Sequence, residues 1–588
     1  MRKLIFFLLL LPLMVGCSLG TTSKDKQQNK PLPSFVSLSG RQDVLMRFTP
    51  EAKYLLLPIQ ESATEGRMRV LIGQHEVDNF VIRLAVDSID YYVPYAWPTD
   101  TGTVLLDMCF WDKEVDRTAC VCWDSIYQSD EFDTTNREPM RPEYHHTPLY
   151  GWMNDPNGMF YDDQTGLWHL YFQYNPYGSL WQNMTWGHST SPDLIHWTHH
   201  PEAIRPNALG TIFSGSCVVD RNNSAGFGEN AVIAIYTNSE MCGQSQSIAY
   251  SLDGGMTFTP YEGNPVLADS LPDFRDPKVF WDEQANCWTM ALACQQEIRF
   301  FQSPDLKNWT FVSRFGKGYG CHDGVWECPD LIRLDNHYVL LVNINPGGPF
   351  GGSATQYFVG DWDGKEFIVE SQKSKEESKW LDYGKDHYAT VTFHNAPDSR
   401  VTALAWVSNW EYANKLPMTQ YRSQNSLPRE LSLFQDDQGE YRVAVMPSPE
   451  ALALKGNQID APTDECMIEI TCPCENKKTV ITLSNDKGEK VVMKLDLCKK
   501  TFSMDRKQSG DCSFSRDFAA VTTAPLFKMA NANANANAVT LFIDHCVLEA
   551  FDGEGAWAMT NLVFPSAPYN HIHVVGGEAT IYEIDRLR

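Results

Sequence analysis

The chain has 588 residues, with 48 Lys and Arg against 74 Asp and Glu and a formal net charge of −26. This length predicts about three or four domains, and 43% hydrophobic with 21% charged residues is the composition of a globular protein, not of a disordered one. A surface this negative repels phosphate backbones, which excludes nucleic acid as a partner. Neutral ligands such as sugars are compatible with it.

The N-terminal residues predict export and lipid anchoring. Two basic residues precede the apolar run 4–16, which is too short to span a bilayer and has the length of a signal-peptide core. The run ends in Leu-Met-Val-Gly before Cys17, a sequence that resembles a bacterial lipobox. The resemblance implies removal of residues 1–16, lipidation of the Cys17 thiol and a polar tether over 17–34. Ordinary signal cleavage beside an incidental cysteine is the alternative. We therefore expect an exported protein, bound to the membrane through this lipid only.

Three strand-rich segments are predicted after the tether. Residues 35–126 carry short alternating apolar runs broken by Gly, Asp and Pro, the pattern of an antiparallel β-domain, and 127–142 is a polar linker. Residues 143–447 are strand-like throughout, with turn residues about every ten positions. A short helical connector is predicted over 448–460, and the alternating strands of 461–588 indicate a C-terminal β-sandwich. The fold class expected is all-β.

An internal repeat predicts the architecture of the central segment. The sequence SPDLIHW at Ser191 recurs as SPDLKNW at Ser303, with weaker copies at Ser251 and Asp361. The steps between these positions are 60, 52 and 58 residues, and each holds about four short strands, which make one blade of a β-propeller. Recurrent hairpin turns are the alternative, but two copies that share five of seven residues disfavour it. The segment accommodates about five blades.

Three acidic motifs in this segment are candidates for chemistry. They are WMNDPNG with Asp155, FRDP with Asp276 and VWECPD with Glu327. Each alone has a structural explanation: a tight turn, a local ion pair at a strand end, and an exposed residue on an edge strand. The first motif is no calcium loop, because acidic residues do not follow at EF-hand spacing.

The spacing of the motifs favours a shared catalytic role. They lie 121 and 51 residues apart, and hence on different blades, whose inner strands converge at the propeller axis. Hydrolysis of a glycosidic bond with retained configuration needs one carboxylate as nucleophile and one carboxylic acid that protonates the leaving oxygen. We expect Trp326 and Cys328 to desolvate Glu327 and favour its protonated form, as a general acid requires.

WMNDPNG, FRDP and WECPD, in this order, resemble the signature of glycoside hydrolase family 32, the invertases, inulinases, levanases and fructan β-fructosidases. Further matches are RP with HHTP from Arg141, FQYNP, WGH, FSGS, DYGKD, WVSNW, LPREL and SMDR with a following SG. The similarity covers about 141–588 and implies a five-bladed propeller followed by a β-sandwich. The N-terminal segment lies outside it, and the Ala-Asn alternation over 530–538 and Ala550–Gly553 depart from the family pattern.

The resemblance also implies roles for individual residues. Asp155 is the expected nucleophile, Glu327 the acid/base and Asp276 the residue that binds the fructose hydroxyls and stabilises the transition state. Positions expected to line the fructose site are Asn154, Gln173, Trp181, Ser214 and Arg275. Neither a metal nor a cofactor is expected. The implied substrates are levan, inulin, fructo-oligosaccharides and sucrose.

Other functions compete with this interpretation. An endo-acting levanase or inulinase uses the same chemistry and differs only in having an open cleft. The stretch WVSNWEYANKLP over 406–417 is more similar to microbial exo-acting members, so we expect exo-action. A non-catalytic fructan-binding lipoprotein would have lost a carboxylate, and all three are present. An adhesion module finds support only in the N-terminal segment. Linkage preference and oligomeric state stay open.

Overall fold

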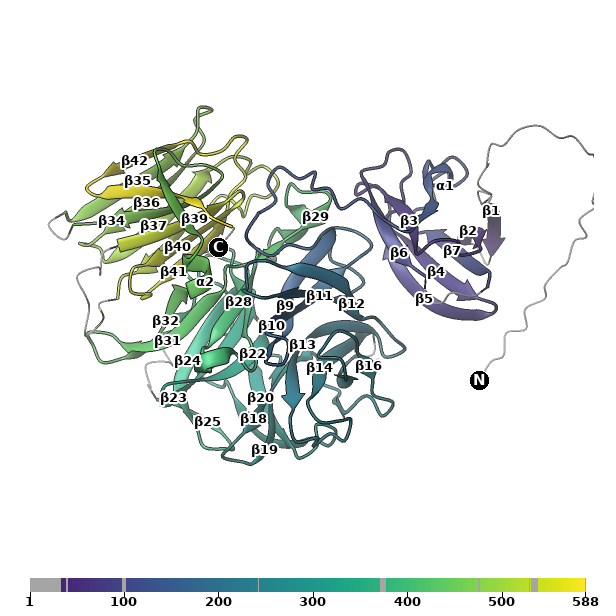
Figure 1. The fold of residues 1–588 in the computed structure, drawn as a ribbon, viewed down its shortest axis with the longest axis horizontal. Coiled ribbons are helices and arrows are strands. Elements are labelled where there is room, and N and C mark those ends of the chain that lie inside the picture. The colour runs from purple at the N-terminus through teal and green to yellow at the C-terminus, as the bar shows by residue number, and fades with distance from the viewer. Residues whose placement is uncertain are drawn as a thin grey trace, which may run out of the picture.

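The computed structural model describes residues 33–38, 41–97, 102–241, 243–370, 377–473, 476–527, 529 and 538–586. The predicted signal peptide, Cys17 and the tether up to residue 32 lie outside these ranges, as does most of the Ala-Asn alternation. The described part of the chain consists mainly of strands. Figure 1 shows a central propeller, with the C-terminal sandwich on one side and the N-terminal domain on the other. The all-β fold class, the propeller and the sandwich are therefore confirmed.

The N-terminal domain consists of two sheets around one apolar core that includes Val44, Leu57 and Val70. The larger sheet has the order β1-β2-β7-β4-β5, and the smaller has the order β6-β3-β8. Strand β8 lies in the stretch predicted as a linker and pairs with β3. The elements are β1 (Ser34–Leu38), β2 (Arg41–Phe48), β3 (Tyr54–Ile59), β4 (Gly66–Ile72), β5 (His75–Ile82), β6 (Tyr91–Ala96), β7 (Val104–Phe110), α1 (Cys122–Ser125) and β8 (Tyr127–Ser129).

Five sheets form the blades of the propeller, and the first strand of each contacts the first strand of the next in a closed ring. The first two blades contain β9 (Gly151–Asp162), β10 (Leu167–Asn175), β11 (Thr185–Ser191), β12 (Thr198–Ile204) and β29 (Tyr421–Arg422), and then β13 (Thr211–Asp220), β14 (Ala231–Glu240), β15 (Gly243–Ser251), β16 (Thr259–Pro260) and β17 (Leu267–Ala268). The third contains β18 (Phe274–Asp282), β19 (Cys287–Cys294), β20 (Glu297–Ser303) and β21 (Thr310–Phe315).

The fourth blade contains β22 (Val325–Leu334), β23 (His337–Asn345), β24 (Ala354–Trp362), β25 (Phe367–Val369) and β26 (Lys379–Trp380). The fifth contains β27 (Tyr388–Thr392), β28 (Thr402–Val407), β30 (Gln424–Asn425), β31 (Arg429–Gln435) and β32 (Tyr441–Pro447). Two 3₁₀-helices, Pro397–Ser399 and Ala413–Lys415, lie in loops of this blade. Strand β29 pairs in parallel with β9, so residues 421–422 from the end of the propeller segment join the sheet of the first blade.

The internal repeat marks the same turn in successive blades. Ser191, Ser251 and Ser303 end the third strands β11, β15 and β20, and Asp361 lies in β24, the third strand of the fourth blade. In the first copy the Asp193 carboxylate accepts hydrogen bonds from the backbone N–H groups of residues 195 and 196, at 3.1 and 2.8 Å. The copy at Ser303 repeats this pattern with distances of 3.0 and 2.8 Å. The repeated sequence therefore forms a turn in which the Asp carboxylate accepts hydrogen bonds from the backbone of the same turn.

The sandwich consists of two sheets, and it begins earlier than predicted. The predicted connector starts as the helix α2 (Pro449–Leu452), whose first turn is capped by the Ser448 hydroxyl. It then continues as β33 (Lys455–Ile459), which pairs with β43. One sheet has the order β33-β43-β34-β39-β40-β41 and the other β38-β37-β36-β35-β42. The remaining bounds are β34 (Glu465–Thr471), β35 (Lys478–Ser484), β36 (Lys490–Asp496), β37 (Thr501–Gln508), β38 (Val521–Pro525), β39 (Ala538–Asp544), β40 (Val547–Asp552), β41 (Ala558–Leu562), β42 (His571–Val575) and β43 (Glu578–Ile584).

Candidate active site

The inner strand of every blade contributes a side chain to one cavity at the propeller axis. These side chains are Asp155 on β9, Ser214 on β13, Asp276 on β18, Glu327 on β22 and Tyr388 on β27. The cavity has a volume of about 380 Å³, within the range typical of small-ligand pockets. Three carboxylates that are far apart in the sequence therefore meet at one place, as their spacing predicted.

Irregular pairing positions these side chains. The pairing of each inner strand with its neighbour shifts register at a residue of the cavity or next to one, and β9 has a second shift between Asn157 and Phe160. Such bulges re-aim side chains that a regular strand would direct to alternate faces. The backbone of Asp276 is left-handed, with φ of 65°, and that of Cys328 has φ of 41°. The backbone therefore adopts an uncommon conformation at Asp276 and directly after Glu327.

Asp155 is partly buried, and two hydrogen-bond donors favour its ionised form. The Ser214 hydroxyl donates to its Oδ2 at 2.7 Å, and the Asn154 amide donates to its Oδ1 at 3.0 Å. The indole N–H of Trp152 donates to Asn154 and fixes that amide. Burial raises the pKa of Asp155, and the charge of Glu327 adds to this, while the hydrogen bonds from Ser214 and Asn154 lower it. The pKa stays above its usual value overall, and the hydrogen bonds offset part of the rise and favour the carboxylate form that a nucleophile needs.

Asp276 is the most buried of the three carboxylates. Its Oδ2 accepts a hydrogen bond from the backbone N–H of Cys328 at 2.9 Å, and the Cys328 thiol lies 3.5 Å from the same oxygen. Burial raises the pKa of Asp276, Arg275 lowers it, and the charges of Glu327 and Asp155 raise it. The net result is a pKa of about 7. An aspartate that is partly protonated near neutral pH can both donate to and accept from the hydroxyls of a bound sugar.

Glu327 is held by two partners. Its Oε1 accepts from Nη2 and Nε of Arg275 at 2.8 and 3.2 Å, and its Oε2 accepts from the Tyr388 hydroxyl. The sequence prediction named Trp326 and Cys328 as its surroundings. Instead, the Trp326 indole N–H donates to the backbone of residue 321, and the Cys328 thiol lies beside the two aspartates. Adjacent strand residues point to opposite faces, which explains the difference for Trp326.

All eight residues predicted for catalysis or sugar binding line this cavity; those besides the three carboxylates are Asn154, Gln173, Trp181, Ser214 and Arg275. Sequence reasoning missed the other lining residues, which are Phe213, Asn345, Tyr388 and Trp410. Three of them lie in or near recognised motifs, since Phe213 begins FSGS, Trp410 ends WVSNW and Tyr388 lies two residues after DYGKD. Asn345 follows no motif that distinguishes it.

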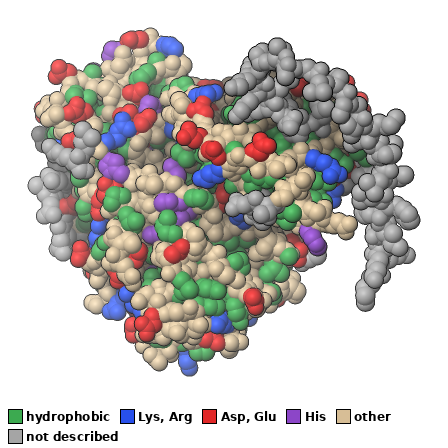
Figure 2. Space-filling view, turned by 45° about the vertical axis from the view of Figure 1, so that its right-hand side comes forward, with side chains coloured by type: hydrophobic (Ala, Val, Ile, Leu, Met, Phe, Trp, Pro, Cys, Tyr) green, Lys and Arg blue, Asp and Glu red, His purple; other side chains and the backbone are tan. Residues whose placement is uncertain are grey.

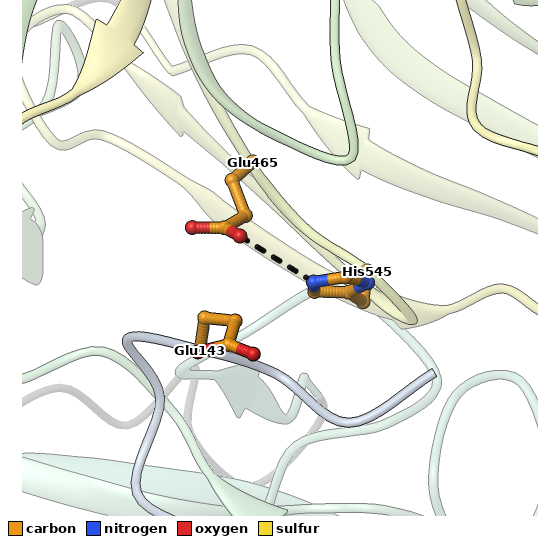
Figure 3. A group of neighbouring side chains, drawn as sticks. All are labelled: Glu143, Glu465 and His545. Atoms are coloured by element: carbon orange, nitrogen blue, oxygen red, sulfur yellow. Dashed lines mark ion pairs between the residues drawn. The ribbon is translucent and has the colours of Figure 1, made fainter. Parts of the chain in front are cut away.

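One further group of side chains has the composition of a metal site. Glu143, Glu465 and His545 lie together where the start of the propeller meets the sandwich (Figure 3). Arg586 already forms ion pairs with Glu143 at 2.8 Å and with Glu465 at 3.0 Å. Burial lowers the pKa of His545, but Glu465, whose carboxylate lies 3.6 Å from the ring, and other nearby carboxylates raise it overall. A guanidinium and a histidine that favours its charged form disfavour a cation here.

Comparison with known proteins agrees with this geometry. The model of the glycosyl hydrolases family 32 N-terminal domain matches residues 145–445, and the model of the family 32 C terminal matches residues 436–586. Residues 40–144 match a domain of unknown function (DUF4980). The levanase of Bacillus subtilis is 40% identical over 467 residues, which are 73% of this chain and 67% of the levanase.

Two further relatives extend the comparison. The invertase of Debaryomyces hansenii is 47% identical over 309 residues, and the match spans 50% of this chain and only 57% of the invertase. The crystal structure of an exo-inulinase from Aspergillus awamori has 31% identity and a TM-score of 0.70, with 77% of this chain and 99% of that one covered. The propeller, the sandwich and the converging carboxylates define a glycoside hydrolase. The chain belongs to glycosyl hydrolase family 32.

Proposed function

We propose that this protein releases fructose from β-fructofuranosides with retained configuration and attacks its substrates from the chain end. The observation that carries the proposal is the convergence of Asp155, Asp276 and Glu327 on one cavity. The relatives named levanase, invertase and exo-inulinase support a fructosyl substrate such as levan, inulin or sucrose.

The chemistry follows from the positions of the two reacting groups. A carboxylate oxygen of Asp155 attacks C2 of the fructosyl unit while Glu327 gives its proton to the leaving oxygen, so that a covalent fructosyl-enzyme forms. Glu327, now a carboxylate, then takes a proton from water, and the resulting oxygen nucleophile attacks C2 and releases Asp155. Asp276 binds the sugar hydroxyls, and Arg275 orients the Glu327 carboxylate.

Exo-action is supported by how one side of the cavity is built. Trp181 and Trp410 both line it. Asn414, in the 3₁₀-helix that follows Trp410, accepts a hydrogen bond from the Trp181 backbone N–H at 3.0 Å. Two loops distant in the sequence thus meet beside the carboxylates, and a wall on that side favours a terminal sugar unit over a passing chain.

The test is a product analysis at early reaction times. Free fructose is the expected first product from inulin and from levan, and sucrose is expected to be cleaved. Oligosaccharides as the main early product would overturn exo-action and leave the hydrolase in place. Absence of any cleavage of inulin, levan and sucrose would overturn the proposed function, and the Glu327→Gln variant controls for contaminating activity.

We further propose that the protein is exported and held at the cell envelope by lipid on Cys17. The support is the sequence pattern of residues 1–17, which lie outside the described part of the chain. In the ranges that the structure covers, no helix is long and apolar enough to cross a membrane.

A further inference from the structure

The loop that carries Trp181 contacts the N-terminal domain on both sides of that residue. It joins β10 to β11 in the first blade, beside the N-terminal domain in Figure 1. Tyr177 and Ser179 before Trp181, and Gln182 and Asn183 after it, each contact the N-terminal domain. A domain outside the matched family 32 regions therefore touches a loop of the candidate active site.

The first contact is a buried polar junction. The backbone N–H of Ser179 donates to Oε1 of Glu61 at 3.0 Å and lies 3.1 Å from the Tyr91 hydroxyl. Arg422 of the propeller donates to the Ser179 carbonyl at 2.8 Å, and its guanidinium lies 3.8 Å from Glu61. Both side chains of this pair are only 10% exposed. Removing one partner of such a pair leaves the other uncompensated.

The second set of contacts is made mainly by the residues that follow Trp181 in the loop. The Asn183 amide accepts from the Val81 N–H and donates to the Val81 carbonyl, both at 2.8 Å, so it pairs with β5 as a neighbouring strand would. The Gln182 amide donates to Glu65 at 3.2 Å. The Tyr177 ring stacks on Phe80, with 3.8 Å between the ring centroids.

From these contacts we propose that the N-terminal domain is a positioning domain, which holds the Trp181 loop and thereby sets the affinity of the active site for its sugar. The inference rests on the proposed function, because it assigns Trp181 to the sugar site. Trp181 is 40% exposed and lines the cavity. A loop that is ordered before the sugar binds does not lose conformational entropy on binding, and this lowers KM.

The first test removes the polar junction from the N-terminal side. Glu61→Ala is expected to raise KM for sucrose by about 2- to 10-fold, the range of a single aromatic contact, with kcat nearly unchanged. Glu61→Gln keeps an acceptor for the Ser179 N–H but removes the charge that faces Arg422, and it is expected to raise KM less than Glu61→Ala does. Val44→Ala lowers the stability of the same domain from its core, away from the loop, and is the matched control. A KM that rises in Val44→Ala as much as in Glu61→Ala would overturn the proposal.

The second test asks whether the effect passes through Trp181. Asn183→Ala changes the propeller side of the contact and leaves the N-terminal domain intact, and it is expected to raise KM in the same way. In a Trp181→Ala background, Glu61→Ala is expected to add no further rise, because coupled residues are not additive. A full additional rise in that background, or an unchanged KM in both single variants, would overturn the proposal.

Hydrogen exchange separates this proposal from the proposed function. Glu61→Ala is expected to speed amide exchange in peptides over 176–184, whether or not the enzyme cleaves a given sugar. Unchanged exchange would overturn the positioning role. A wild-type protein that cleaves no β-fructofuranoside would instead overturn the proposed function, while the exchange result would still decide whether the domain holds the loop.

Discussion

At the scale of single residues, the site combines one buried and two partly buried carboxylates with hydrogen-bond donors that offset their loss of water. Asp155 has Ser214 and Asn154, and Asp276 has the Cys328 backbone N–H. Glu327 has Arg275 and Tyr388. Tyr388 stays protonated as a donor, because burial and the charge of Glu327 raise its pKa well above the usual value. Each carboxylate therefore has different partners, which is how similar groups take different roles.

The two reacting carboxylates can be tested by near-isosteric substitution. Asp155→Asn and Glu327→Gln are each expected to lower kcat by at least about 100-fold, because each removes a reacting group and nearly preserves shape. Steady-state kinetics on sucrose measure the loss, and circular dichroism checks that the variants are folded. A variant that keeps more than about a tenth of the wild-type turnover contradicts the role given to that residue.

The pKa of Asp276 predicts a pH-dependent effect on stability. Its folded value of about 7 lies above the ordinary 3.8. Below pH 3.8 the group is protonated in both states and has no effect. As the pH rises from about 3.8 to about 7 the unfolded chain releases this proton while the folded state still holds it, so the folded state loses stability, and the loss is complete above pH 7. Asp276→Asn is therefore expected to be more stable than wild type at pH 8, by the order of a few kcal/mol, and the difference shrinks toward pH 4. Thermal unfolding at several pH values measures it; a difference that is constant with pH contradicts the assignment.

At the scale of elements, several family motifs without catalytic residues join the propeller to the sandwich. Asp382 of DYGKD and Glu549 of β40 both pair with Arg429 of LPREL, at 2.8 and 3.1 Å. Asp386 pairs with Arg506 of SMDR. Burial raises the pKa of Asp382, but His387 and Arg429 lower it to about 2 overall. These motifs specify how the two domains dock.

Breaking this junction should destabilise the whole protein. Arg429→Met leaves Asp382 and Glu549 buried without their cation, and the expected loss is about 3–5 kcal/mol in the free energy of unfolding. Arg221→Met is the control, because the Arg221–Asp163 pair is about half exposed on both sides and an exposed pair contributes at most about 1 kcal/mol. Chemical denaturation compares the two. Similar losses in both variants would show that the Arg429 cluster does not stabilise the junction.

The strands could be predicted where apolar residues alternate with polar ones. The site could be predicted where several family motifs occur together. Alternating runs and the turn around Asp193 depend on local chemistry, so the strands and blades could be read from the sequence. The convergence of Asp155, Asp276 and Glu327 could be predicted because the inner strands of different propeller blades meet at the axis. The conformation of the strands at these residues could not be predicted, because a bulge depends on the partner strand. The error about Trp326 has a simpler origin, because its side chain and that of Glu327 are adjacent on a strand and point to opposite faces.

At the scale of the whole molecule, the described residues on the visible face carry no single block of acidic side chains (Figure 2). On the face in Figure 2, acidic, basic and hydrophobic side chains are interspersed. Most contacts between domains were not predictable from the sequence, because they join residues more than a hundred positions apart, such as Val81 with Asn183. Neither residue belongs to a pattern that identifies its partner.

The proposed lipid anchor concerns the whole molecule and can be tested in cells. Cys17→Ser removes the thiol that would carry the lipid and leaves the folded domains unchanged, so the protein is expected to move from the membrane fraction to the soluble fraction. A single acyl chain binds membranes only marginally, whereas several chains anchor stably, so the shift should be nearly complete. Immunoblots of membrane and soluble fractions measure it, and Cys498→Ser, at an exposed cysteine of the sandwich, is the control. Wild-type protein found wholly in the soluble fraction would contradict the anchor, and release by Cys498→Ser would show that the shift is not specific to residue 17.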